Sequence, residues 1–110
     1  MKVDVQKKAE ELSVKHNCKV TPIVFHDEEK SEDIIGYIKE PNRMTKLRVM
    51  DKAMTSPVTA SSELFDSIII KEESDPRFTS EKSEDDKYYI GGTMEAFKTV
   101  EIAVNTFKKK

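Results

Sequence analysis

Two histidines and a single cysteine are the residues of this chain that could bind a transition metal. Zinc needs three or four converging ligands, usually paired Cys or His residues a few positions apart. His16 and Cys18 flank the expected end of a helix, and His26 falls on an expected strand. Because there is no second cysteine to complete the set, we expect no metal site and interpret all three as packed or surface side chains.

Catalysis would need a nucleophile with a base beside it, and His16 with Cys18 is the nearest such pair in the sequence. Two positions apart on a helix, these side chains do not face each other, and no recognisable carboxylate would orient the histidine. The segment 91–93, Gly-Gly-Thr, could hold an anion at a helix start, but it lacks the rest of a phosphate-binding loop. We therefore expect a protein that is not an enzyme and that uses no cofactor.

Acidic residues at 27–33, "DEEKSED", could offer oxygen ligands to calcium. An EF-hand loop requires glycine at its sixth position, and the sixth residue from Asp27 is Glu32. The segment fits better as the solvated tip of a hairpin, where charge also discourages pairing between sheets.

The elements that position these residues follow from hydrophobic spacing and from Pro, Gly and capping residues. The pattern predicts an α+β fold in one domain, residues 1–110, with an N-terminal helix, a β-hairpin forming a small antiparallel sheet, and then three helices. The expected elements are a helix over 3–16, strands over 19–26 and 34–39, a helix capped by Asn42, a helix capped by Ser56 with Pro57 at its first position, and a last helix capped by Thr93.

The apolar positions of the three later helices are expected to form their packing faces. We expect the third helix to end before Asp75-Pro76 and Gly91-Gly92 to break the chain ahead of the last helix. The apolar positions are Leu47, Met50, Ala53 and Met54, then Val58, Leu64, Phe65, Ile68 and Ile69, and finally Met94, Phe97, Val100, Val104 and Phe107. In the hairpin, Ile23 and Phe25 would share one face and Val24 and His26 the other.

The stretch "EESDPRFTSEKSEDDKYYIGG", residues 72–92, is acidic and interrupted by Pro and Gly. We interpret residues 72–84 as a mobile acidic connection, in which Ser80 or Ser83 caps a short helical turn leading to Tyr88 and Tyr89. A tyrosine combines an apolar ring with a polar tip, so these two are expected at the edge of the core or of a partner site.

Composition limits the classes of partner. Hydrophobic and charged residues each make up 36% of the chain, and the net charge is -2. This balance argues against nucleic-acid binding, and the helix "ASSELFDSIIIKEE" lacks the donors of a DNA recognition helix. No apolar run is long enough to span a bilayer, and one cysteine fits a reducing cytoplasm. We expect a cytoplasmic protein that gains stability from a protein partner or from a copy of itself.

Three features together resemble a known family. They are the strand-to-helix junction "YIKEPNR" at 37–43, Leu64-Phe65 in the middle helix, and the "DDKYY" element at 85–89 before a closing amphipathic helix. Over residues 34–107 this arrangement resembles the small tail assembly chaperones of long-tailed bacteriophages and prophages. The charged segment "KEESDPRFTSEKSE" departs from the family pattern, because it has no glycine-rich turn.

The resemblance implies a non-enzymatic protein of the bacterial cytoplasm. Such chaperones coat the long helical tape-measure protein, keep it soluble, and give way to tail-tube subunits, which makes both proteins expected partners. The alternative is a generic bacterial interaction or regulatory module, for example a homodimer. The residues expected to bind the partner are Tyr37, Arg43, Leu64, Phe65, Tyr88, Tyr89 and Phe97.

Overall fold

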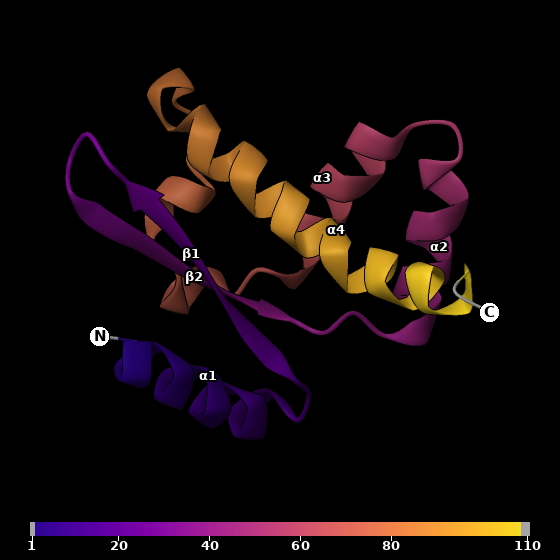
Figure 1. The fold of residues 1–110 in the computed structure, drawn as a ribbon, viewed down its shortest axis with the longest axis horizontal. Helices are drawn as coiled ribbons and strands as arrows, with labels where there is room; N and C mark the ends of the chain where they lie inside the picture. Colours follow the sequence, from indigo (N-terminus) through magenta and orange to yellow (C-terminus); the bar gives the residue numbers. More distant parts are fainter. Residues whose placement is uncertain (1, 109–110) are drawn as a thin grey trace.

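The computed structural model describes the backbone of residues 2–108 and the side chains of residues 4–100. It confirms the α+β arrangement of an N-terminal helix, an antiparallel two-stranded hairpin and three further helices (Figure 1). Three single-turn 3-10 helices lie between the last two α-helices, α3 and α4. The elements are α1 (Lys2–His16), β1 (Val20–Asp27), β2 (Glu32–Lys39), α2 (Arg43–Ala53), α3 (Pro57–Ile68), η1 (Lys71–Glu73), η2 (Pro76–Phe78), η3 (Ser83–Asp85) and α4 (Asp86–Lys108).

The hairpin separates two layers of helices. Its strands pair from Val20 with Lys39 to Asp27 with Glu32. Alternation along β1 is as predicted, because Ile23 is buried while Val24 is 54% exposed. Figure 1 shows α1 on one side of the hairpin and the helices α3 and α4 on the other.

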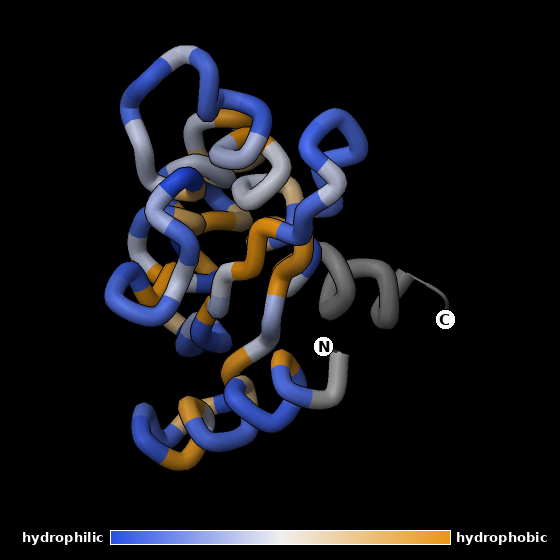
Figure 2. Tube along the Cα trace, turned by 90° about the vertical axis from the view of Figure 1, so that its left-hand side faces the viewer, coloured by the Kyte–Doolittle hydropathy of each residue, from blue (hydrophilic) through white to orange (hydrophobic). Residues whose placement is uncertain are grey.

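The side of the hairpin that faces α1 holds a small hydrophobic cluster, which is separate from the main core. Ala9 and Leu12 of α1 pack with Val20, Tyr37 and Ile70. The side chain of Ser13 joins the helix to the strand, because its hydroxyl oxygen accepts a hydrogen bond of 2.8 Å from the backbone N–H of Val20. In Figure 2, where α1 lies at the bottom, hydrophobic and hydrophilic segments alternate along the helix, as expected when one face of it is covered.

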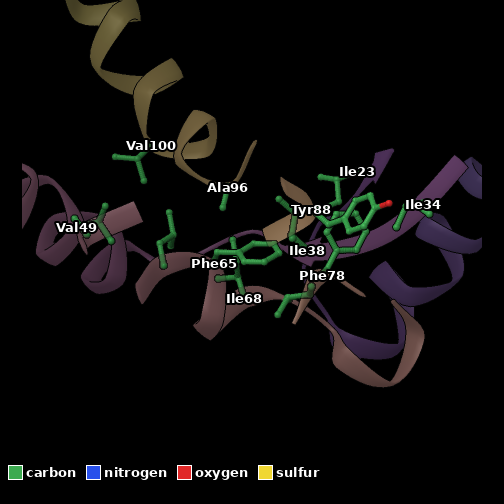
Figure 3. Packing of buried hydrophobic residues seen from close by; sticks show 13 residues of the cluster. Ile23, Ile34, Ile38, Val49, Phe65, Ile68, Phe78, Tyr88, Ala96 and Val100 are labelled. Carbon is green, nitrogen blue, oxygen red and sulfur yellow. The ribbon is translucent and has the colours of Figure 1, made fainter. Parts of the chain in front are cut away.

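The main core fills the other side of the hairpin. Figure 3 shows it running from Val49 of α2 through the Phe65 ring to Ile34 of β2. Phe65 is fully buried and meets the rings of Phe78 and Tyr89 edge to face, at centroid distances of 6.4 and 5.6 Å. Such aromatic contacts add stability beyond the burial of area.

The start of α2 follows the prediction, and the start of α3 follows it in part. Asn42 caps α2, because its Oδ1 accepts a 2.9 Å hydrogen bond from the Thr45 N–H. Pro57 occupies the first turn of α3, as expected. The expected cap by the Ser56 side chain is wrong, since its hydroxyl makes no capping bond and only its carbonyl receives the N–H of Ala60, at 2.9 Å.

The end of α3 differs from the prediction. The helix stops at Ile68, and the backbone of the next two residues turns extended along the outer edge of β2. Ile69 forms a bridge with Ile38, and the N–H of Ile70 donates to the carbonyl of Tyr37 at 2.9 Å. A run of three isoleucines has the stiff branched side chains that favour strands, and the edge of β2 supplies the backbone partner that such a run needs.

The break expected at Gly91-Gly92 is also wrong, because both glycines lie inside α4, which begins at Asp86 rather than after Thr93. Their lack of a side chain serves packing. A Cβ on Gly92 would lie 2.5 Å from Cζ of Phe65, and one on Gly91 would lie 3.3 Å from Cδ2 of Phe25. The expected packing of Val104 and Phe107 concerns side chains outside the described residues.

The acidic connection is attached to the hairpin at several points. The N–H of Asp75 donates to the Ile35 carbonyl at 2.9 Å, and the hydroxyl of Ser74 receives the Tyr37 N–H at the same distance. Phe78, at the end of η2, is buried in the main core. These contacts place the connection along the hairpin and the main core. The mobility expected for residues 72–84 stays a prediction.

Candidate protein-binding surface

The exposed face of α2 is apolar. Met44 is 63% exposed, Leu47 51% and Met54 83%, and Met50 is also exposed. We call these four residues the α2 stripe. They recur at three- and four-residue steps, which places them along one side of a helix. The sequence predicted Leu47, Met50 and Met54 as a packing face, whereas here they face solvent.

The opposite side of α2 does the packing. Val49 is buried against the main core and Ala53 is partly buried beside it. These residues are four apart, so they share a side of the helix that faces α3. Since Val49 and Ala53 already anchor α2, its second apolar side is left without an intramolecular partner.

Four basic side chains and one acidic side chain accompany the stripe on α2. Lys46 forms an ion pair with Glu40 and Lys52 forms one with Glu63, both at 2.6 Å. Arg43 and Arg48 are exposed and form no ion pair with any residue that the structure describes. Asp51, one turn after Leu47, is also exposed and has no ion pair among the described residues, so the unpaired side chains beside the stripe are two arginines and one carboxylate.

A groove of about 350 Å³ runs beside the stripe, between α2 and α3. Arg48 and Lys52 line it from α2 and Glu63 lines it from α3, while the buried side chains of Val49 and Leu64 border it. A concave strip with an apolar floor and a charged rim suits a protein side chain better than a small polar substrate.

Four of the seven residues expected to bind a partner lie in the interior. Leu64, Phe65 and Tyr88 belong to the main core and Tyr37 to the cluster under α1, and each is at most 4% exposed. A partner could not reach these side chains without opening the fold. Their apolar character reflects packing.

The other three residues differ in their positions. Arg43 is exposed at the start of α2, beside the stripe. Tyr89 and Phe97 of α4 are partly buried and pack on the main core. The Tyr89 hydroxyl bonds to Ser62 and, at 3.0 Å, to Oδ1 of Asp66, so it joins α4 to α3.

Met44 and Arg48 complete the surface but were missed by the sequence reasoning. The signal that could have found them is that α2 carries apolar residues on two sides, Val49 with Ala53 and Met44 with Leu47. A short helix packed on one side can bury only one of these sets.

A second group of polar side chains joins the hairpin tip to α4. Asp27 is a buried carboxylate whose Oδ2 accepts a 2.5 Å hydrogen bond from the Tyr88 hydroxyl and lies 3.4 Å from Nζ of Lys87. Its Oδ1 accepts from the N–H of Lys30 at 3.2 Å. These interactions, led by the Tyr88 bond, lower the pKa of Asp27 from 3.8 to about 2.

Arg77 extends this group into the acidic connection. Its guanidinium donates to Oδ2 of Asp75 at 2.8 Å and to Oε1 of Glu32 at 2.9 Å, and it lies 5.7 Å from the centre of the Tyr88 ring. The bond to Arg77 holds the pKa of Asp75 below its ordinary value. Since every charged member has a partner of opposite sign, the group holds the connection against the hairpin and offers no unpaired group for catalysis.

Replacing Tyr88 by phenylalanine tests the Asp27 contact through pH. Because the pKa of Asp27 is lower in the folded chain than in the unfolded one, its ionised form stabilises the fold above about pH 4, and this contribution is lost as the pH falls toward 2. We expect Tyr88→Phe to lower the melting temperature at pH 7, and the gap from the wild type to narrow between pH 4 and pH 2. Thermal melts followed by circular dichroism at closely spaced pH values measure this difference in melting temperature. A difference that stays constant with pH would contradict stabilisation of ionised Asp27 by the Tyr88 hydroxyl.

The remaining candidate residues do not converge. His26 bonds through Nδ1 to Oδ1 of Asp33 at 2.6 Å on the exposed face of the hairpin, and Cys18 is a partly buried free thiol. Within residues 4–100, no three His, Cys, Asp or Glu side chains gather as metal ligands would. No helix in the described part of the chain is long and apolar enough to cross a membrane.

No protein-family model, curated protein or solved structure matches the chain. The resemblance to tail assembly chaperones therefore stays a prediction based on its residues. The observation that the structure adds is the α2 stripe.

Proposed function

We propose that this chain is a non-enzymatic tail assembly chaperone of a bacteriophage or prophage, which binds the helical tape-measure protein in the bacterial cytoplasm. The observation that carries the proposal is the α2 stripe, which places four exposed apolar side chains on one side of a single helix. The other large apolar side chains that are exposed among the described residues are spread over α1, β1, α3 and α4, and they are Val14, Val24, Val58, Ile90 and Met94. Contiguous exposed apolar surface is typical of interaction sites. The family resemblance over residues 34–107 supplies the kind of partner.

Methionine suits the stripe to a partner with many similar but unequal segments. Its unbranched thioether side chain adapts to different shapes, and methionine-rich surfaces accept several sequences. An amphipathic helix that lies along α2 would present apolar residues at three- and four-residue steps to the stripe. A long helical chain offers such segments repeatedly.

The size of the stripe limits the strength of one contact. Full burial of a Leu or Met side chain stabilises by about 1.5–3 kcal/mol, and the stripe side chains are already partly covered. Association costs on the order of 4–15 kcal/mol in lost freedom. One copy would bind weakly and reversibly, so coating would depend on many copies along one chain, and tail-tube subunits could displace them.

Sequencing the DNA beside the gene, followed by co-expression, tests the proposal. We expect a neighbouring reading frame for a long helix-rich protein that is insoluble alone and soluble with this chain. The matched variants are Leu47→Asp in the stripe and Val14→Asp on α1, where Val14 is 83% exposed. Rescue by the wild type and by Val14→Asp, but not by Leu47→Asp, is the expected result. Neighbouring genes unrelated to tails would contradict the proposal and favour the alternative of a self-associating module.

A further inference from the structure

The two unpaired arginines beside the α2 stripe indicate the charge of its partner. Of the basic residues on α2, Lys46 and Lys52 are neutralised by Glu40 and Glu63. Arg43 and Arg48 are exposed and have no ion pair with any of the described residues, and they outnumber the single acidic side chain of the helix, Asp51. An arginine guanidinium presents a fork of donors that matches a carboxylate.

We propose that the α2 stripe receives an amphipathic helix of another chain, which carries Asp or Glu beside its apolar face. This inference rests on the proposed function and specifies the segments that the partner must contain. The apolar side chains of that helix would lie on Met44, Leu47 and Met54. Its carboxylates would bind Arg43 and Arg48 at the border of the contact, where complementary charge sets orientation and partner choice.

The length of the stripe sets the length of the segment. Ten residues separate Met44 from Met54, which is about 15 Å along a helix axis, or roughly three turns. The partner segment would thus be about three turns long, with apolar residues at three- and four-residue steps. The groove between α2 and α3, lined by Arg48, lies next to this track and could take a larger side chain.

A second copy of this chain fits the stripe less well. Closed dimers are symmetric, so residue i of one copy meets residue j of the other and j meets i. In an antiparallel pair of α2 helices centred on Leu47, each Arg48 would lie opposite Lys46 of the other copy and each Arg43 opposite Asp51. Such a pair would give Arg43 a carboxylate but would place Arg48 against a like charge, which opposes association, whereas an acidic helix offers carboxylates to both arginines.

Synthetic peptides of about 18 residues, long enough for a marginal isolated helix, test the inference. Three labelled peptides share their leucine positions and carry Glu, Gln or Lys at the flanking positions. We expect fluorescence anisotropy at low salt to show that the Glu peptide binds about tenfold more tightly than the Lys peptide, as two exposed charge pairs can produce. High salt should narrow the difference.

Charge-reversal variants identify the residues responsible. Arg43→Glu with Arg48→Glu should make the chain prefer the Lys peptide. The matched control, Lys7→Glu with Lys15→Glu, changes the net charge equally at exposed positions on α1 and should keep the preference for Glu.

Two kinds of result would overturn the inference. Equal affinity for the three peptides, still lost in Leu47→Asp, would exclude an acidic partner while leaving the proposed helix-binding function intact. Failure of every peptide to bind would remove the α2 stripe as a helix-binding surface. Light scattering that shows a wild-type dimer and a Leu47→Asp monomer would assign the stripe to self-association instead.

Discussion

Replacing Gly92 by leucine is expected to destabilise the fold severely. A Cβ at this position would lie 2.5 Å from Cζ and 2.8 Å from Cε1 of Phe65, closer than real carbon atoms approach. The ring cannot move aside easily, because it is fully buried between Phe78 and Tyr89. Overpacking of a core costs about 1–3 kcal/mol, and a leucine adds atoms beyond Cβ, so we expect a loss at the upper end of that range.

Urea unfolding followed by circular dichroism measures this loss, and Gly91→Ala is its matched control. A Cβ on Gly91 would lie 3.3 Å from the partly buried Phe25 ring, which can yield by a few tenths of an ångström. Alanine in place of glycine also favours a helix by about 1 kcal/mol. Gly91→Ala should therefore be neutral or slightly stabilising, and a Gly92→Leu variant as stable as the wild type would show that α4 does not pack on Phe65 as described.

Removing the Phe65 ring is the second change with a large expected effect. Phe65 is fully buried and meets two other aromatic rings edge to face. Truncation of a buried phenylalanine costs about 3–5 kcal/mol, which is much of the stability of a small domain. We expect Phe65→Ala to lower the free energy of unfolding by that amount, and a loss below about 1 kcal/mol would contradict a central position for the ring.

The two positions should also be coupled. A leucine at 92 clashes with the ring of Phe65, and truncation of that ring removes the clash and leaves a cavity. The Phe65→Ala, Gly92→Leu double variant should thus be less destabilised than the sum of the single losses, by about 0.5–3 kcal/mol. Additive losses would mean that the two residues do not touch.

The hairpin and the cap of α2 could be predicted because local residues determine them. Alternating apolar residues specify which face of β1 is buried. Asn42 follows a proline and precedes a helical pattern, and its side chain can reach the backbone of Thr45 within one turn. Neither feature depends on a distant part of the chain.

The errors concern positions where a distant element decides the structure. Gly91-Gly92 was predicted to interrupt the helix because glycine weakens a helix. No neighbouring residue in the sequence indicates that the rings of Phe25 and Phe65 occupy the space where side chains at these positions would lie. Ile69 was expected on a helix, and it is extended because the edge of β2 is available to it.

The candidate binding surface, the α2 stripe, could be recognised only from the fold, because distant elements decide which apolar residues are exposed. Spacing alone shows that α2 has apolar residues on two sides, and it cannot show which side α3 covers. Tyr37, Leu64, Phe65 and Tyr88 were expected to bind a partner, and packing from sequence-distant elements buries them. Arg43 is the expected residue that lies beside the α2 stripe.

The most direct test of the proposed binding surface is the affinity of matched variants for the long helix-rich protein that we expect to be encoded beside the gene. Leu47→Asp places a charge in the middle of the α2 stripe, and Val14→Asp places the same charge on an exposed valine of α1. Titration calorimetry should show binding weakened at least about tenfold by Leu47→Asp and unchanged by Val14→Asp. Equal affinity of the two variants would contradict a partner site on α2.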